Sequence, residues 1–167
     1  MPKPSEWAHT AAELIKPLTS RWALAGALAA RLYRLAPRGT VDADILVEWV
    51  PGLTQRFEQA GYDVREIADP EAGHPHLLIA RRGDERVDLI IPTVPYQQLA
   101  LDRAVDNVLT VEDVIVHKLI AWRPRDQDDI ASVLAAEHDL DEQYIEHWAA
   151  EWEVLDRWRR AAPGTEP

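Results

Sequence analysis

The sequence has no cysteine, no long apolar run and no excess of positive charge. Without cysteine, the chain cannot form disulfides, thiolate zinc sites or iron–sulfur clusters, and it has no thiol nucleophile. No stretch approaches the ~20 apolar residues of a membrane-spanning helix, and the first residues contain no apolar core of a signal peptide. We therefore expect a cytoplasmic protein without a membrane partner.

The charge balance limits the classes of ligand. The chain has 29 acidic and 18 basic residues, a net charge of −11. A general nucleic-acid binder neutralises phosphates with a basic face, so this composition disfavours that class, although a local basic groove remains open. The 167 residues, 47% of them hydrophobic, suffice for one domain with a core. We predict a single domain over residues 1–167.

The order of predicted elements indicates an α/β fold with a small mixed or mostly antiparallel sheet flanked by helices. Apolar alternation predicts strands near 45–47, 62–67, 76–80 and 86–91, with a hairpin turn at 82–85. Helices are predicted after Pro4, over 27–36, from 53 to 61, from 111, over about 124–137 and over 141–161. Residues 92–109 give no clear pattern. The catalytic core would cover about 20–95 and the helical part about 110–161, with a flexible tail at 162–167.

Two acids, Asp42 and Asp44, stand at the start of a predicted strand in the segment RGTVDADILV. Residues two apart in a strand share a face, so the two carboxylates would lie side by side. They would repel each other, and a divalent cation between them would reverse the sign of that interaction. Oxygen ligands of this kind suit Mg²⁺, which proteins hold with one or two carboxylates and substrate phosphates. The simpler interpretation is a pair of solvated acids at a strand end.

Two further residues favour the metal interpretation. Gly26 lies between a short apolar segment and a predicted helix, where a phosphate could approach backbone N–H groups at the helix N-terminus. Asp88 lies in the middle of the predicted strand ERVDLII, where an acid needs a partner or an exposed face. Adjacent strands could bring Asp88 beside the first two acids as a third carboxylate.

The order of these features resembles the DNA polymerase β-like nucleotidyltransferase superfamily. In that signature an apolar segment, a Gly-Gly or Gly-Ser step and a helix precede an Asp-x-Asp strand, and a third Asp follows on a later strand. The segment TVEDVIVHKLIAWRPRDQDDIASVL is similar to the branch of AbiEii-like and MenT-like toxins, with Lys118 on one helix and Arg125, Asp126 and Asp129 opening the next. The resemblance covers residues 22–134. The second small residue of the step is Ala27, which keeps the N–H but offers no hydroxyl.

The resemblance implies a set of site residues. Asp42, Asp44 and Asp88 would bind Mg²⁺ or Mn²⁺ and act in catalysis, with Asp88 a candidate base. The other implied members are Gly26, Ala27, Arg38, Thr40 and Lys118 for the nucleotide, and Lys118 and Asp126 for catalysis. A surface location for Lys118, and a helix-dipole role for Asp126, remain alternatives from the residues alone.

The implied function is magnesium-dependent transfer of a nucleoside monophosphate from an NTP to a hydroxyl acceptor. The toxin branch implies the tRNA 3′ end as acceptor and a cognate antitoxin as partner. One alternative is a small-molecule, aminoglycoside-type nucleotidyltransferase, whose cationic acceptor fits an acidic protein better than RNA does. The other is a nucleotidyltransferase-like binding module without turnover, for which Ala27 is the main argument.

Overall fold

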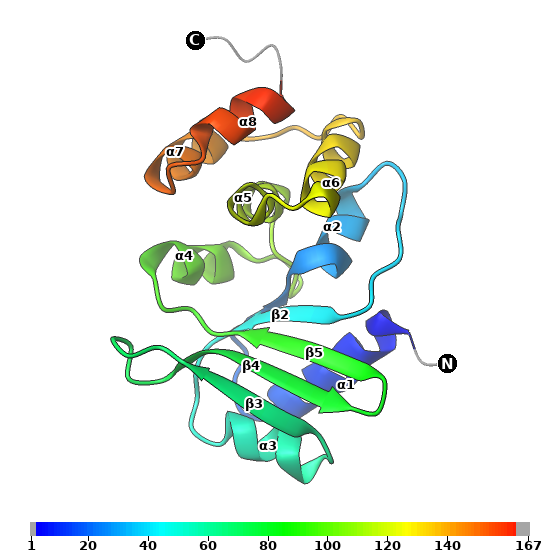
Figure 1. Ribbon diagram of the computed structural model, residues 1–167, viewed down its shortest axis with the longest axis vertical. Coiled ribbons are helices and arrows are strands. Elements are labelled where there is room, and N and C mark those ends of the chain that lie inside the picture. Colours follow the sequence, from blue (N-terminus) through cyan, green and yellow to red (C-terminus); the bar gives the residue numbers. More distant parts are fainter. Residues whose placement is uncertain (1–2, 163–167) are drawn as a thin grey trace. The chain divides into compact units, whose positions relative to one another are not determined.

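The computed structural model describes residues 3–162, and the chain divides into two compact units (Figure 1). The first, here called the sheet unit, consists of residues 3–28 and Gly39–Leu109. The second, the helical unit, consists of Ala29–Arg38 and residues 110–162. The tail predicted at 162–167 lies outside the described residues, except for its first residue.

The sheet unit contains a five-stranded mixed sheet, which confirms the predicted fold class. Its strands are β1 (Trp22–Leu24), β2 (Ala43–Val47), β3 (Asp63–Ala68), β4 (Pro75–Arg82) and β5 (Glu85–Ile90), in the order β1-β2-β5-β4-β3. Only β2 and β5 pair in parallel; the other three pairings of this sheet are antiparallel. The helices of the unit are α1 (Pro4–Ile15), α3 (Leu53–Gln59), α4 (Pro95–Arg103) and the start of α2 (Gly26–Tyr33).

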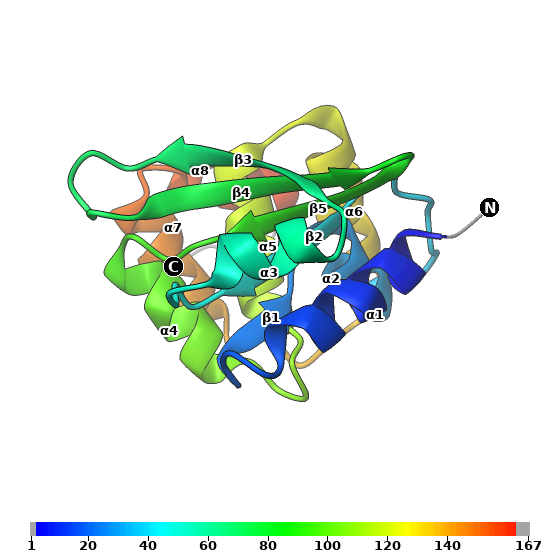
Figure 2. The same cartoon turned by 90° about the horizontal axis from the view of Figure 1, so that it is seen from below.

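Helices α1 and α3 lie on one face of this sheet, and the core of the unit forms between them and the strands (Figure 2). Ile45 and Val47 of β2 and Leu89 of β5 are fully buried in this core. Because side chains alternate along a strand, Asp44 and Asp88 project from the opposite face. The apolar pattern that fills the core therefore also fixes the face on which the acids stand.

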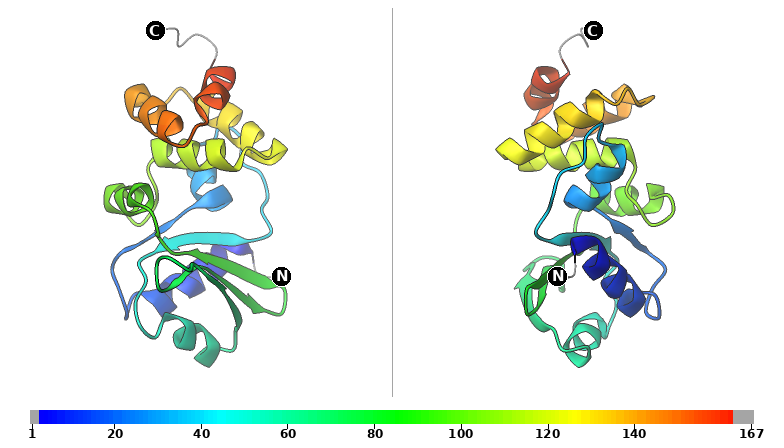
Figure 3. Two further views of the ribbon diagram at one scale, coloured as in Figure 1. Left: turned by 60° about the vertical axis from the view of Figure 1, so that its left-hand side comes forward. Right: turned by 90° about the vertical axis from the view of Figure 1, so that its right-hand side faces the viewer.

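The helical unit consists of α5 (Val111–Ala121), α6 (Pro124–Leu134), α7 (Glu142–Glu151) and α8 (Leu155–Ala161), together with the last turns of α2. Helix α5 packs against α6 and α7, and α8 packs against α6 and α7 (Figure 3). Thr110 caps α5, since its hydroxyl accepts the N–H of Asp113. Within residues 3–162, no helix combines the length and the apolar character needed to cross a membrane.

One predicted helix needs correction, and one helix lies where the sequence shows no clear pattern. The single helix predicted over 141–161 is wrong, because α7 ends at Glu151 and α8 begins at Leu155. Glu153 adopts a left-handed φ of 56° between them, and the N–H of Val154 bonds the carbonyl of Ala149, a turn that ends a helix. Residues 92–109 contain the helix α4, which begins at a proline, the residue whose fixed φ suits a first helical position.

Candidate metal site and the acidic pair of the helical unit

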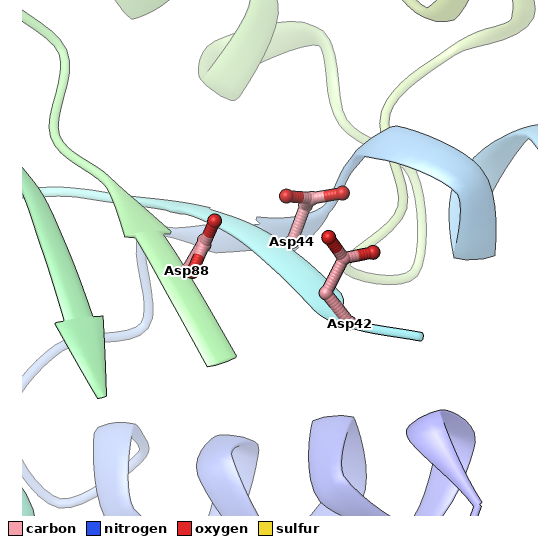
Figure 4. A group of neighbouring side chains, drawn as sticks. All are labelled: Asp42, Asp44 and Asp88. Atoms are coloured by element: carbon pink, nitrogen blue, oxygen red, sulfur yellow. The ribbon is translucent and has the colours of Figure 1, made fainter. Parts of the chain in front are cut away.

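Three aspartates meet where β2 and β5 run side by side. The parallel pairing sets Asp44 directly opposite Asp88, and Asp42 lies one residue before β2 begins. Each acid offers one carboxylate oxygen, and these atoms all lie within 4.8 Å of one another (Figure 4). Asp42 and Asp44 are half-buried and Asp88 is buried. The structure thus brings together three carboxylates that are separate in sequence.

Asp42 is oriented by its neighbour Thr40. The Thr40 hydroxyl donates to Asp42 Oδ1 at 2.9 Å, and it lies 3.3 Å from the backbone carbonyl of Asp42. A hydroxyl that donates to one carboxylate oxygen fixes the rotation of that carboxylate and leaves lone pairs for another ligand. The structure therefore connects Thr40 directly with the carboxylate group; its expected contact with a nucleotide stays a prediction.

Gly26 is needed because the Asp44 side chain lies against its Cα. A Cβ at this position would stand 1.9 Å from Asp44 Oδ2, far inside contact distance, and Gly26 has a φ of +56°. The Ala25 N–H bonds the backbone carbonyl of Asp44 at 2.9 Å. This close approach seats the first turn of α2, with Gly26 and Ala27, beside one of the three acids.

Arg86, which the sequence analysis did not single out, belongs to the same cluster. Its Nε donates to Asp88 Oδ1 at 2.9 Å and its Nη2 to Asp88 Oδ2 at 2.7 Å. The hydrogen bonds to Asp88 raise the pKa of Arg86, and the charges of Asp42 and Asp44 add to this. The sequence did contain a signal for this contact, because residues 86 and 88 are two apart in a predicted strand and so share a face.

Lys118 and Asp126 lie in the helical unit, where they form a buried ion pair. Lys118 Nζ lies 3.0 Å from Asp126 Oδ1 and 2.7 Å from Asp129 Oδ2. The side chains of Asp126 and Asp129 are 0% and 1% exposed, and that of Lys118 is 7% exposed. Asp126 also accepts the backbone N–H of Arg123 at 3.0 Å, which caps α6. The alternative of a solvated surface Lys118 is wrong.

Arg38 binds Asp129, the second acid that Lys118 contacts. Its Nε and Nη2 donate to the two oxygens of Asp129 at 2.7 and 2.6 Å, and Arg34 also donates to Asp129 Oδ1. Burial opposes ionisation of Asp129, but the hydrogen bonds from Arg38 and Lys118 outweigh it and lower its pKa to about 2. The network joins the segment after α2 to α5 and α6.

The three carboxylates of the sheet unit fit a divalent cation. Their ligand atoms are all hard oxygens, which Mg²⁺ and Mn²⁺ prefer over the nitrogen and sulfur ligands of zinc sites. Three carboxylates within 4.8 Å of one another repel, and a bound cation would turn that repulsion into attraction. Asp42, Asp44 and Asp88 are therefore the residues that would hold the metal.

The solved structures that resemble the chain include the following three. The solution structure of the antibiotic-resistance factor ANT(2'')-Ia matches with a TM-score of 0.55 and 20% identity, over 93% of this chain and 91% of that chain. The crystal structure of ANT(2'')-Ia in complex with adenylyl-2''-tobramycin gives 0.50 and 20%, over 92% and 96%. A protein of H. pylori assigned as a nucleotidyltransferase gives 0.48 and 15%, over 93% and 81%.

The chain has the nucleotidyltransferase fold. No family model matches the sequence, and no curated protein matches it. At 20% identity or less, the structural matches establish the fold and leave the acceptor open. The carboxylate group is compatible with the divalent metal of such a fold.

Proposed function

We propose that this protein is a metal-dependent nucleotidyltransferase that moves a nucleoside monophosphate from an NTP to a hydroxyl acceptor. The observation that carries the proposal is the meeting of Asp42, Asp44 and Asp88 on one face of the β2–β5 pair. The nucleotidyltransferase fold supports it independently. Three like-charged carboxylates brought together by a non-local strand pairing repel one another, and a bound divalent cation would relieve that repulsion.

The residues of the sheet unit would divide the work. Asp42, Asp44 and Asp88 would hold Mg²⁺ or Mn²⁺, which when bound neutralises phosphate charge and polarises the phosphorus under attack. The Thr40 hydroxyl donates to the Asp42 carboxylate, and the absence of a Cβ at Gly26 leaves space for the Asp44 side chain. The N–H groups of Gly26 and Ala27 at the start of α2 would face the phosphates.

The reaction would be an in-line displacement. The acceptor oxygen forms a bond to the α-phosphorus, the bond from that phosphorus to the bridging oxygen breaks, and pyrophosphate leaves with the bonding electrons. The acceptor proton passes to a carboxylate, for which Asp88 is the candidate. The roles expected for Lys118, Asp126 and Arg38 stay predictions of the resemblance to the toxin branch.

We propose a polyhydroxylated, cationic small molecule as the acceptor. The net charge of −11 attracts such a molecule and disfavours a polyanion. ANT(2'')-Ia, which shares the fold, has been crystallised with adenylyl-2''-tobramycin, a nucleotide joined to an aminoglycoside. The tRNA 3′ end, with a cognate antitoxin as partner, is the competing acceptor.

Incubation of the protein with each α-labelled NTP, Mg²⁺ and either an aminoglycoside panel or total tRNA tests the proposal. We expect label on an aminoglycoside, and loss of that label when EDTA is added. Label on tRNA would retain nucleotidyl transfer but replace the acceptor. No label with any NTP and acceptor would favour the binding-module alternative and contradict the proposal.

A further inference from the structure

Arg86 occupies both oxygens of the one buried acid in the proposed metal site. Its guanidinium makes two parallel hydrogen bonds to Asp88, at 2.9 and 2.7 Å. We infer that Arg86 couples metal binding to phosphate binding, by competing with a lone cation for Asp88 and then binding the phosphates that arrive with the metal. This inference rests on the proposed function.

The competition follows from the two hydrogen bonds. A divalent cation bound through Asp88 must take an oxygen at ~2.0–2.1 Å, and each Asp88 oxygen now accepts an Arg86 N–H. The cation must also bind beside the positive charge of the guanidinium, which repels it. Arg86 therefore weakens binding of a cation that arrives alone.

The exposure of the Arg86 side chain allows the displaced guanidinium to move into solvent. The Arg86 side chain is 37% exposed, whereas that of Asp88 is 12% exposed, so Arg86 can turn towards solvent while Asp88 stays fixed in its strand. A guanidinium released beside a metal site is suited to a polyphosphate, because its planar N–H groups match phosphate oxygens. A cation–polyphosphate complex would thus give Arg86 a new partner after the cation has displaced it from Asp88.

The same hairpin contains a matched ion pair that distinguishes coupling from ordinary strand stabilisation. Arg82 on β4 binds Glu85 at 3.0 and 3.3 Å, and the Arg82 side chain is 39% exposed. Neither residue belongs to the carboxylate group. Arg82→Gln therefore removes a partly exposed ion pair away from the proposed metal site, together with the Arg82 hydrogen bond to the Ala60 carbonyl.

The test measures Mn²⁺ binding by calorimetry in the wild type, Arg86→Gln and Arg82→Gln, first with Mn²⁺ alone and then with Mn²⁺ and inorganic triphosphate. For Arg86→Gln we expect about tenfold tighter binding of Mn²⁺ alone and about tenfold weaker binding of the Mn²⁺–triphosphate complex, the order of one charge-assisted hydrogen bond. Arg82→Gln should match the wild type in both titrations. Thermal melting shows that each variant is folded.

Two outcomes overturn the inference in different ways. Equal binding of Mn²⁺ alone to the wild type and Arg86→Gln, or a change that Arg82→Gln reproduces, refutes the role of Arg86 and leaves the proposed function standing. Failure of both the wild type and Arg86→Gln to bind Mn²⁺, with or without triphosphate, refutes the metal site itself, and the proposed function with it. Opposite shifts in the two titrations support the inference.

Discussion

The two acidic clusters of this chain use the same residue type for different ends. In the sheet unit, Asp42 and Asp44 are half-buried, Asp42 receives a hydroxyl and Asp88 receives one guanidinium. In the helical unit, Asp126 and Asp129 are fully enclosed. The cations that bind them are Lys118, Arg34, Arg38 and Arg123.

The difference teaches how to separate a ligand site from a structural network. Enclosed carboxylates that already bind several cations hold the fold together, and removing one partner leaves buried charge behind. Three carboxylates that lie within 4.8 Å of one another, with one guanidinium among them, still repel one another, and a divalent cation would relieve that repulsion. The first cluster should therefore respond in activity when it is mutated, and the second in stability.

The largest expected effect is that of Asp42→Ala on the rate of nucleotidyl transfer. We expect the rate to fall at least about 10³-fold, because neutralising charge in the transition state with a metal is worth several kcal/mol. The melting temperature should hold or rise, since a source of repulsion is removed. Label transfer and a thermal melt measure the two quantities; an Asp42→Ala protein with full activity would contradict the metal assignment.

The reciprocal change is Asp129→Asn in the helical unit. We expect the free energy of unfolding to fall by about 3–5 kcal/mol, because Arg34, Arg38 and Lys118 lose a buried charged partner. Asp128→Asn is the matched control: it also pairs with Arg34, but its side chain is 67% exposed, so its cost should be about 0–1 kcal/mol. Urea unfolding of the two variants checks this; equal midpoints would show that the network does not stabilise the unit.

Gly26→Ala tests whether the close approach to Asp44 matters. The added Cβ would displace the carboxylate that lies 1.9 Å from its position, so we expect Mn²⁺ affinity to fall about 10–100-fold, as when the support of a metal ligand is lost. Gly39→Ala is the control, because a Cβ there meets nothing within 4 Å. Similar Mn²⁺ affinities for the two variants would rule out this role of Gly26.

The acid stability of the protein should depend on Asp129. Its pKa in the folded chain is about 2, against an ordinary value of 3.8, so its ionised form stabilises the fold above pH ~4. That contribution is lost as the pH falls from about 4 to about 2. Melting temperatures of the wild type and Asp129→Asn across this range should converge towards pH 2; parallel curves would exclude Asp129 as the group responsible.

The smallest effect is expected from Thr40→Val. Loss of the hydroxyl that orients Asp42 should weaken Mn²⁺ binding about fivefold, the order of the ~1 kcal/mol that a typical hydrogen bond contributes net. Thr40→Ser keeps the donor and should stay near the wild type. The Mn²⁺ titration separates the two variants, and a Val variant that binds as the wild type does would remove Thr40 from the support of the site.

The sequence predicted the parts of the site that depend on local pattern. Strand alternation places Asp42 and Asp44 on one side of the chain, although β2 begins only at Ala43. The meeting with Asp88 needs a parallel pairing of β2 with β5, which no local pattern specifies. The family resemblance implied a third Asp on a later strand but did not specify this pairing. Arg86 was missed although its spacing from Asp88 was visible, because a single arginine in a hairpin is usually a solvated residue.

The remaining errors have physical causes. The break between α7 and α8 contains neither glycine nor proline, and the left-handed residue is Glu153, so the sequence carries no signal of a helix end. The burial of Asp129 depends on Arg34 and Arg38, which lie far earlier in the chain. An acid near a helix start is commonly solvated, and only the tertiary arrangement shows otherwise.

The parallel pairing of β2 with β5 has a consequence for the order of events during synthesis. When residues 42–47 have been synthesised, two of the three acids are present. The strand β5, which carries Asp88 and pairs with β2, follows only after α3, β3 and β4. The group of three carboxylates therefore cannot be complete in any nascent chain that stops short of β5. Metal binding by this protein would therefore report that β5 has paired with β2.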